Sequence, residues 1–320
     1  MSEATPMPTA PEALPLRDGS ITIARLIDLY MAHYDGRDTT RVQRLSWWLE
    51  KLGSLRLQDV SDDHLHVALE ALAAQSTRYY AGKDVEGRAI YKPKGRPLAP
   101  ATINRYAVAI SAVFTWAIRR RVAPKGWDHP GRRIERRTEN NEKTRFLSTE
   151  ERERLLLACK ASPWPRLYLL VLLALTTGAR KGELLRLRWR DIDLEQRVAH
   201  VATTKNGDPK VLPLTPPVIE QLRAIQGAPS ALVFASRRRP DQAYAFELRW
   251  AEALREARVR SFRFHDCRHT CASWLAQQGA TLLEIGDLLG HRQISMTKRY
   301  SHLASSHRSA LVNRTLGDLR

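Results

Sequence analysis

The feature that most constrains the fold is a basic, helix-breaking segment in the middle of the chain. Residues 119–145 carry ten Lys or Arg residues against four Asp or Glu, and the two prolines and two glycines among them would interrupt any helix. With 320 residues the chain also exceeds one typical domain. We therefore expect a first domain at residues 19–121, a basic linker at 122–146 and a second domain at 147–320.

The first of these domains is expected to be helical. Trp47 and Trp48 lie in a segment of helical periodicity, so we expect them in the core rather than stacked on nucleic-acid bases. Residues 79–98 lose the periodicity and collect glycines, prolines and basic residues, which predicts a loop. The loop is either a solvated connection or a contact to DNA phosphates, and the sequence leaves both open. The segments with helical periodicity are 21–34, 41–52, 61–73 and 100–117.

The second domain is expected to add a small antiparallel β-sheet to its helices. Strand-like segments at 198–202 and 211–214 are joined by Lys205-Asn206-Gly207-Asp208, and an Asn-Gly step is a strong hairpin signal. An apolar helix is expected at 167–176 and a final weak helix at 308–319, the latter packing on a neighbouring protomer. The predicted fold class is mainly α with a small antiparallel β-sheet.

The N-terminus and the cysteines indicate the compartment. Residues 1–18 contain four prolines and lack the charged start and apolar core of a secretory signal, so we expect a disordered tail. Three cysteines are too few for a disulfide framework in a chain of this size, which favours reduced thiols and a cytoplasmic protein.

Net charge indicates the partner. The chain carries a formal charge of +18 and has a sequence pI near 10.3, which favours a polyanion. A membrane surface is one such polyanion. However, the sequence lacks a run of about 18 apolar residues, and its richest stretch, residues 167–175, is too short to cross a bilayer. A nucleic acid is therefore the favoured partner.

Unusual polar residues gather between Phe264 and Tyr300. His265, Arg268 and His269 share a helix face, so their cationic groups can converge on one anion. A capped helix then ends at Gly290, which is followed by His291 and, nine residues on, by Tyr300. Basic neighbours of Tyr300 are expected to favour its phenolate, which would make it a candidate nucleophile.

Five pieces of sequence, taken in chain order, resemble the tyrosine recombinases, the phage-integrase family of site-specific DNA recombinases. Each piece alone is weak, but together they form a specific signal, which is close from residue 147 onward and general before it. The pieces are Thr177-Gly178-Ala179-Arg180-x-x-Glu183, Lys205 in the hairpin, His265-x-x-Arg268-His269, Leu289-Gly290-His291 and Thr297-x-x-Tyr300. The resemblance implies a helical core-binding domain followed by an α+β catalytic domain.

The same resemblance implies a role for each matched residue. Tyr300 would attack a phosphodiester and conserve its energy as a phosphotyrosine. Arg180 and Arg268 would hold two non-bridging oxygens, and Lys205 would protonate the departing 5′-oxygen. Two histidines, His265 and His291, would bond to the phosphate, and either could take the tyrosine proton. Glu183 and His269 are expected in supporting positions, and no metal or nucleotide cofactor is expected.

The partners implied are double-stranded DNA and three further copies of the chain, as a homo-tetramer on two DNA sites that passes through a Holliday junction. Accessory DNA-bending proteins are a further candidate partner, and the enzyme would act in the cytoplasm at the nucleoid. A catalytically inactive DNA-binding protein and a type IB topoisomerase remain as alternatives. The basic residues expected to contact DNA are Lys92, Lys94, Arg96, Arg105, Arg119, Arg120, Arg121, Arg132, Arg133, Arg237 and Arg238.

A metal site is the other interpretation of residues 265–271. His265 and His269 lie close in sequence to Cys267 and Cys271, and all four residue types ligate zinc. The cysteines, however, lie off the helix face that carries the histidines, so the four could not share one tetrahedron. We therefore expect no metal, and we expect both cysteines to fill space in the core.

Overall fold

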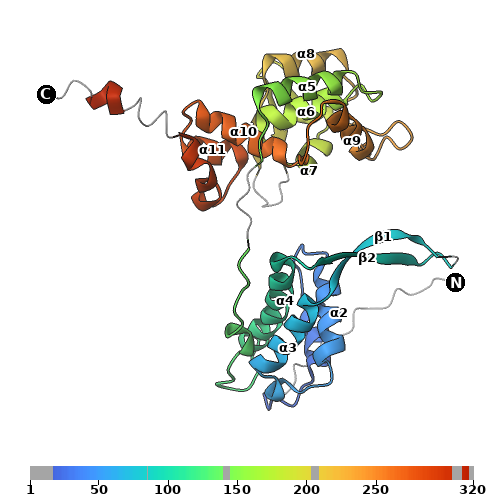
Figure 1. The fold of residues 1–320 in the computed structure, drawn as a ribbon, viewed down its shortest axis with the longest axis vertical. Coiled ribbons are helices and arrows are strands. Elements are labelled where there is room, and N and C mark those ends of the chain that lie inside the picture. Colours follow the sequence, from blue (N-terminus) through green and yellow to red (C-terminus); the bar gives the residue numbers. More distant parts are fainter. Residues whose placement is uncertain (1–16, 85, 140–144, 203–208, 305–311, 317–320) are drawn as a thin grey trace, which may run out of the picture. The chain divides into compact units, whose positions relative to one another are not determined.

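The chain divides into two compact units. The computed structural model describes residues 17–84, 86–139, 145–202, 209–304 and 312–316, and the units are Met1–Asn141 and Glu142–Arg320 (Figure 1). Each unit has a core of its own. Within the described ranges no helix is both long enough and apolar enough to cross a bilayer.

The first unit is built from four α-helices around one apolar core. Leu26, Trp48 and Phe114 are fully buried there, and the indole nitrogen of Trp48 donates a hydrogen bond to the carbonyl of Tyr106 at 2.9 Å. Trp47 packs against the same core, so the expectation for both tryptophans is confirmed. The elements are α1 (Ile23–Ala32), α2 (Arg41–Leu52), η1 (Leu57–Asp59), α3 (Asp62–Ala73), α4 (Pro100–Arg119) and η2 (Pro130–Arg132).

The loop predicted for residues 79–98 is wrong, because these residues form a β-hairpin. Strand β1 (Ser76–Lys83) pairs antiparallel with β2 (Ala89–Pro97), and irregularities in the register accommodate Gly82 at φ +118°. Both strands are edge strands, so prolines and glycines are tolerated there. Tyr80 lies opposite Tyr91 with ring centroids 6.0 Å apart, and such aromatic pairs stabilise strand pairing.

Most of the segment expected to link the domains packs with the first unit. Val122 and Ala123 are buried in its core, and His129 is 2% exposed. Further on, Asn104 of α4 binds the backbone of Arg137 twice, donating to its carbonyl at 2.8 Å and accepting from its N–H at 2.9 Å. Apolar residues within the segment thus make it a strap across α4, although its prolines and glycines exclude an α-helix and leave only the short η2 among its described residues.

In the second unit the other elements pack around α6 (Leu167–Thr177), which is buried on nearly every side. Beside its helices lies a three-stranded antiparallel sheet in the order β3-β4-β5, in which Val201 of β4 lies opposite Lys210 of β5. The predicted strands and the mainly helical fold class are confirmed. The remaining elements are α5 (Thr149–Lys160), α7 (Lys181–Leu185), η3 (Trp189–Asp191), β3 (Ile192–Asp193), β4 (Val198–Val201), β5 (Lys210–Pro213), α8 (Pro216–Ala224), α9 (Glu247–Glu256), α10 (Asp266–Gln277), α11 (Leu282–Leu289), η4 (Ile294–Met296) and η5 (Lys298–Ala304).

Two glycines end the helices that precede the candidate site. Gly178 ends α6 at φ +60°, where a Cβ would lie 2.3 Å from a side-chain carbon of Leu289, and Gly290 ends α11 at φ +67°. Only glycine adopts this left-handed conformation at little cost. The chain therefore turns sharply just before Arg180 and just before His291. The expected final helix is described only at residues 312–316, so the rest of residues 308–319 lies outside the described residues.

Candidate active site

Arg180 is fixed at the start of α7 by the carboxylate of Glu183. One oxygen of Glu183 accepts from the Arg180 backbone N–H at 2.9 Å, and the other accepts from its guanidinium at 2.8 Å. Glu183 is only 2% exposed. Burial opposes its ionisation, but the hydrogen bonds from Arg180 prevail and lower the pKa of this carboxyl. Glu183 is thus a buried anion that orients one guanidinium.

Arg268 reaches the same region from α10. Its guanidinium donates to the carbonyl of Gly178 at 2.8 Å, and the residue is 4% exposed. Burial and the nearby Arg180 lower the pKa of Arg268 to about 10. Two guanidinium groups near one carboxylate leave an excess of positive charge, which suits a bound anion such as a phosphate.

His291 and Lys210 line a pocket of about 620 Å³ together with Arg180. Nδ1 of His291 lies 2.8 Å from the hydroxyl oxygen of Thr297. Burial, followed by the charges of Arg268 and Arg180, lowers the pKa of His291 to about 4. The imidazole is therefore neutral near pH 7 and can either donate or accept a hydrogen bond.

Tyr300 lies on η5 and is 1% exposed. Its hydroxyl oxygen lies 2.6 Å from Nδ1 of His269. The expectation that basic neighbours favour the phenolate is wrong, because burial outweighs the charges of Arg299 and Arg268 and raises the pKa of Tyr300. The phenol therefore keeps its proton unless a base removes it.

His269 is the imidazole in contact with that phenol. Burial and the neighbouring His265 lower the pKa of His269 to about 4, so it is neutral near pH 7. Sequence reasoning gave the proton-accepting role to His265 or His291 and expected His269 only in a supporting position. His265 is exposed, and its ring centroid lies 5.2 Å from that of His269. His269 and Tyr300 are 31 positions apart in the sequence, and nothing in the sequence indicates their contact.

Lys210 was missed by sequence reasoning, and Lys205 lies outside the described residues. Lys210 is 9% exposed, and its ammonium nitrogen is buried without a hydrogen-bond partner among the described residues. Burial and the nearby Arg268 lower the pKa of Lys210 to about 8. The alternation along the predicted strand could have indicated its burial. Lys210 and Leu212 alternate with exposed Val211 and Pro213 along β5, so the lysine lies on the inward face.

The cysteines are buried thiols. Cys159, Cys267 and Cys271 are all free and buried, as core fillers would be. Burial raises the pKa of Cys271 to about 11 and that of Cys159 to about 12, so neither thiol ionises readily. Within the ranges that the structure describes, no three His, Cys, Asp or Glu residues come together as a metal site.

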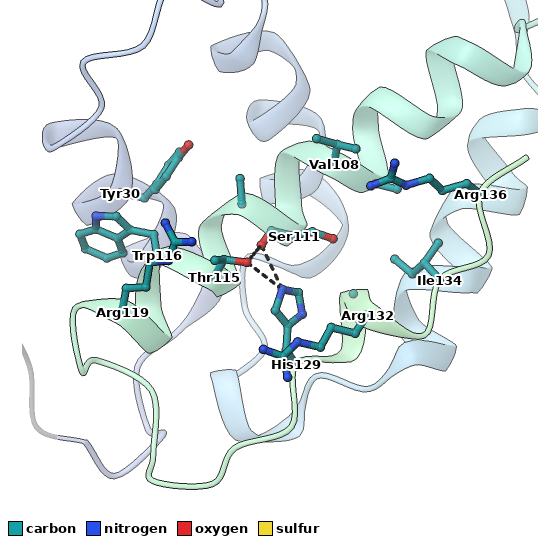
Figure 2. Close-up of a pocket in the computed structure, with 13 residues that line it drawn as sticks. Tyr30, Val108, Ser111, Thr115, Trp116, Arg119, His129, Arg132, Ile134 and Arg136 are labelled. Carbon is teal, nitrogen blue, oxygen red and sulfur yellow. Dashed lines mark hydrogen bonds between the residues drawn. The ribbon is translucent and has the colours of Figure 1, made fainter. Parts of the chain in front are cut away.

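The basic residues expected to contact DNA are all exposed, and some of them surround a pocket of about 690 Å³ on the first unit. Figure 2 shows Arg119 and Arg132 at this pocket with Arg136, which sequence reasoning did not select. His129 holds the strap to α4 through contacts to Ser111 and Thr115 (Figure 2). The exposed set is Lys92, Lys94, Arg96, Arg105, Arg119, Arg120, Arg121, Arg132, Arg133, Arg237 and Arg238.

These features define a protein with a buried tyrosine in contact with a histidine, and two neighbouring arginines, on a mainly helical scaffold. The sequence model of the Phage integrase family matches residues 145–307, about half of the chain. The chain therefore belongs to this family, that of the tyrosine recombinases. The integrase of Salmonella phage P22 is 27% identical over 299 residues, covering 86% of this chain and 74% of its own. A shufflon-specific DNA recombinase of Escherichia coli is 30% identical over 226 residues, covering 69% and 56%.

Solved structures share the fold. The Tn1549 transposon integrase, in complex with a circular intermediate DNA, superposes with a TM-score of 0.69 at 18% identity, covering 92% of this chain and 100% of its own. A lambda integrase dimer bound to a COC′ core site gives a TM-score of 0.64 at 19% identity, covering 90% and 79%. The likeness therefore extends over both units of the chain and establishes the fold.

Proposed function

We propose that this protein is a site-specific recombinase that cuts and rejoins double-stranded DNA through a 3′-phosphotyrosine intermediate. The observation that carries the proposal is the contact between the Tyr300 hydroxyl and His269, beside a guanidinium pair that leaves positive charge unbalanced. A phenol held against a neutral base, near groups suited to a phosphate, is the arrangement that nucleophilic attack on phosphorus requires.

The first step transfers the phosphoryl group to the protein. The Tyr300 oxygen bonds to phosphorus as the bond to the 5′-oxygen breaks, and the phenol proton passes to Nδ1 of His269. Arg180 and Arg268 hold the non-bridging oxygens, where charge increases in the transition state. The departing 5′-oxygen takes a proton from Lys205, a lysine being able to give one up where an arginine is not.

The second step reverses the first on a different strand. A free 5′-hydroxyl attacks the phosphotyrosine and gives its proton to the neutral Lys205, while the bond from phosphorus to the Tyr300 oxygen breaks and the protonated His269 returns its proton to the phenol. The exchanged strand is thus joined without an external energy source. His265 and His291 bond to the phosphate throughout. Because the ring of Tyr300 is 1% exposed, we expect η5 to shift as the phosphate enters.

DNA is held by exposed positive charge on both units. The arginine-lined pocket of the first unit and the hairpin residues Lys92, Lys94 and Arg96 suit the phosphate backbone, and Arg237 and Arg238 add charge on the second unit. A two-stranded ribbon such as β1-β2 also has the width that a major groove admits.

Assembly is proposed as a homo-tetramer on two DNA sites with a Holliday-junction intermediate, acting at the nucleoid in the cytoplasm. The solved structure of a lambda integrase tetramer bound to a Holliday junction supports this assembly, because its fold matches that of this chain with a TM-score of 0.62. Recombination would serve DNA integration or excision, with accessory DNA-bending proteins as candidate partners. The weak C-terminal helix is proposed to pack on the neighbouring protomer.

The proposal is tested by trapping the covalent intermediate between Tyr300 and DNA. DNA flanking the gene supplies the candidate attachment site, and a duplex nicked beside the scissile phosphate should trap wild-type protein on denaturing gels. Tyr300→Phe should trap none, whereas Tyr168→Phe should trap as wild type does. A wild type that binds the duplex but never becomes attached would identify an inactive DNA-binding protein. Relaxation of plasmids that lack the site would indicate a topoisomerase.

A further inference from the structure

Lys210 places a buried ammonium group in the pocket that also contains Arg180 and His291. The residue opens β5 opposite Val201, and its side chain passes close to Gly290, where a Cβ would lie 3.6 Å from Cδ of the lysine. A lysine with four methylene groups normally extends its charge to water. Lys210 does not, because its nitrogen is buried and has no hydrogen-bond partner among the described residues.

The groups around Lys210 do not neutralise it. Arg268, Arg180 and His291 are cationic or neutral, and Glu183 is the one carboxylate that favours its charged form among the groups acting on it. Both oxygens of Glu183 already accept hydrogen bonds from Arg180. Cys271 on α10 faces the same region and holds its proton, because burial raises its pKa to about 11.

The rim of the pocket carries the remaining charges. Glu284 and Asp287 of α11 line it with Arg292, and both acids are exposed to water. Glu284 is engaged with its own helix, where it accepts from the Thr281 backbone at 2.7 Å. Away from the rim, the three cations Lys210, Arg180 and Arg268 act on one another and on a single carboxylate, that of Glu183. This excess of positive charge is that of a site prepared for an anion.

We propose that Lys210 is a third phosphate-binding residue of this pocket, donating to the scissile phosphate a hydrogen bond that it does not make in the unbound protein. The inference rests on the proposed function and adds a residue to it. Burial holds the pKa of Lys210 at about 8 in the unbound protein, and an arriving anion favours the ammonium form. Phosphate binding is then coupled to proton uptake at this one lysine.

A purely structural lysine would look different. It would form an ion pair with a carboxylate, as Lys181 does with Glu247 at 3.2 Å, or it would cover an apolar surface and end in water. Lys210 does neither within the described residues. The cost of burying it is left without compensation in the unbound protein, and a phosphate oxygen would supply that compensation.

The experiment uses orthovanadate as the phosphate probe, so it does not require DNA cleavage. Lysine ¹³Cε signals are followed by NMR across pH in the full chain, and Lys210 is assigned by its loss in Lys210→Met. We expect its titration midpoint near pH 8 in the free protein, rising by one pH unit or more with vanadate bound. Because vanadate itself titrates in this range, each affinity is compared with that of Lys210→Met at the same pH, and the ratio of wild type to variant should rise about tenfold from pH 9 to pH 7.

Two further variants keep the test decisive. Lys160→Met, on α5, should match wild type, and Lys210→Arg should bind vanadate well, with a ratio to Lys210→Met that stays constant between pH 7 and pH 9. An unmoved Lys210 midpoint with vanadate bound, or undiminished vanadate affinity in Lys210→Met, would overturn the inference. Neither result touches the recombinase proposal, which is decided separately by the Tyr300 adduct.

Discussion

Positive charge occurs in this molecule in two physical settings. The charges of the hairpin and of the arginine-lined pocket are exposed and remain hydrated. Those of Arg268 and Lys210 are buried, and burial lowers the pKa of each. Exposed charges gain from counterion release along any duplex, whereas buried charges are costly until one anion occupies one position. We therefore expect the first set to govern how tightly DNA binds and the second to govern what happens to a single phosphate.

Substitution of Arg268 should have the largest effect. Replacing it with alanine or lysine should reduce formation of the covalent adduct by about 10³-fold, because a guanidinium that stabilises transition-state charge is lost or loses its two-pronged geometry. DNA affinity, measured by gel shift, should change by less than about threefold. Arg255→Ala, an exposed change on α9, is the control. An equal loss of affinity and cleavage would break the distinction between the two sets.

His269 is expected to give the next largest effect. His269→Ala removes the base in contact with the Tyr300 hydroxyl, so single-turnover cleavage should fall by about 10²-fold near pH 7. Part of the rate should return at higher pH, as the phenol ionises without help. His302→Ala, at an exposed histidine nearby, should leave the rate unchanged. A rate deficit that is the same at every pH would indicate a structural role instead.

The pH dependence of the free energy of unfolding shows what the buried charge of Lys210 costs. Its pKa is about 8 in the folded protein and 10.5 ordinarily, so the cost of its charge is complete below pH 8 and disappears as pH rises through 10.5. Lys210→Met should therefore increase the free energy of unfolding by about 2 to 3 kcal/mol at pH 7 and by little at pH 10.5. Urea denaturation at the two pH values measures this. A destabilised variant at pH 7 would show that the lysine has a partner in the folded protein.

The exposed set should respond to salt. Changing Lys92 and Lys94 together to glutamine should weaken DNA binding by about fivefold and flatten the slope of log affinity against log salt by about two units. Cleavage at saturating protein should be unaffected. Gln substitutions at Lys51 and Lys160, which lie on α2 and α5, serve as the matched pair. Should cleavage at saturation fall instead, the hairpin would have to influence the chemical step.

Local chemistry explains which elements could be predicted from the sequence. Thr281 and Glu284 form the expected capping box, and the sharp ends at Gly178 and Gly290 follow from glycine in a left-handed conformation. Such features involve residues within one turn of each other. The β1-β2 hairpin was missed because its prolines and glycines resemble those of a loop, and cross-strand pairing leaves no local mark.

The same distinction applies within the candidate site. Motif spacing selected Arg180, Arg268 and His291, but it could not show that His269 rather than His265 meets Tyr300, because that depends on how η5 packs against α10. Spacing also could not give the sign of the Tyr300 pKa shift, which follows from burial rather than from neighbouring charges in sequence. Lys210 was overlooked for a related reason, since its cost arises only when strand β5 is folded.

The peptide at Gly178 has a mechanical consequence. Its carbonyl anchors Arg268, and two residues later the chain reaches Arg180, so one short stretch of backbone fixes the separation of both guanidinium groups. With Leu289 filling the space where a side chain would be, the stretch cannot move without disturbing α11. We therefore expect the two arginines to contact a phosphate together only when it occupies one position. A displaced phosphate would lose its contacts with both.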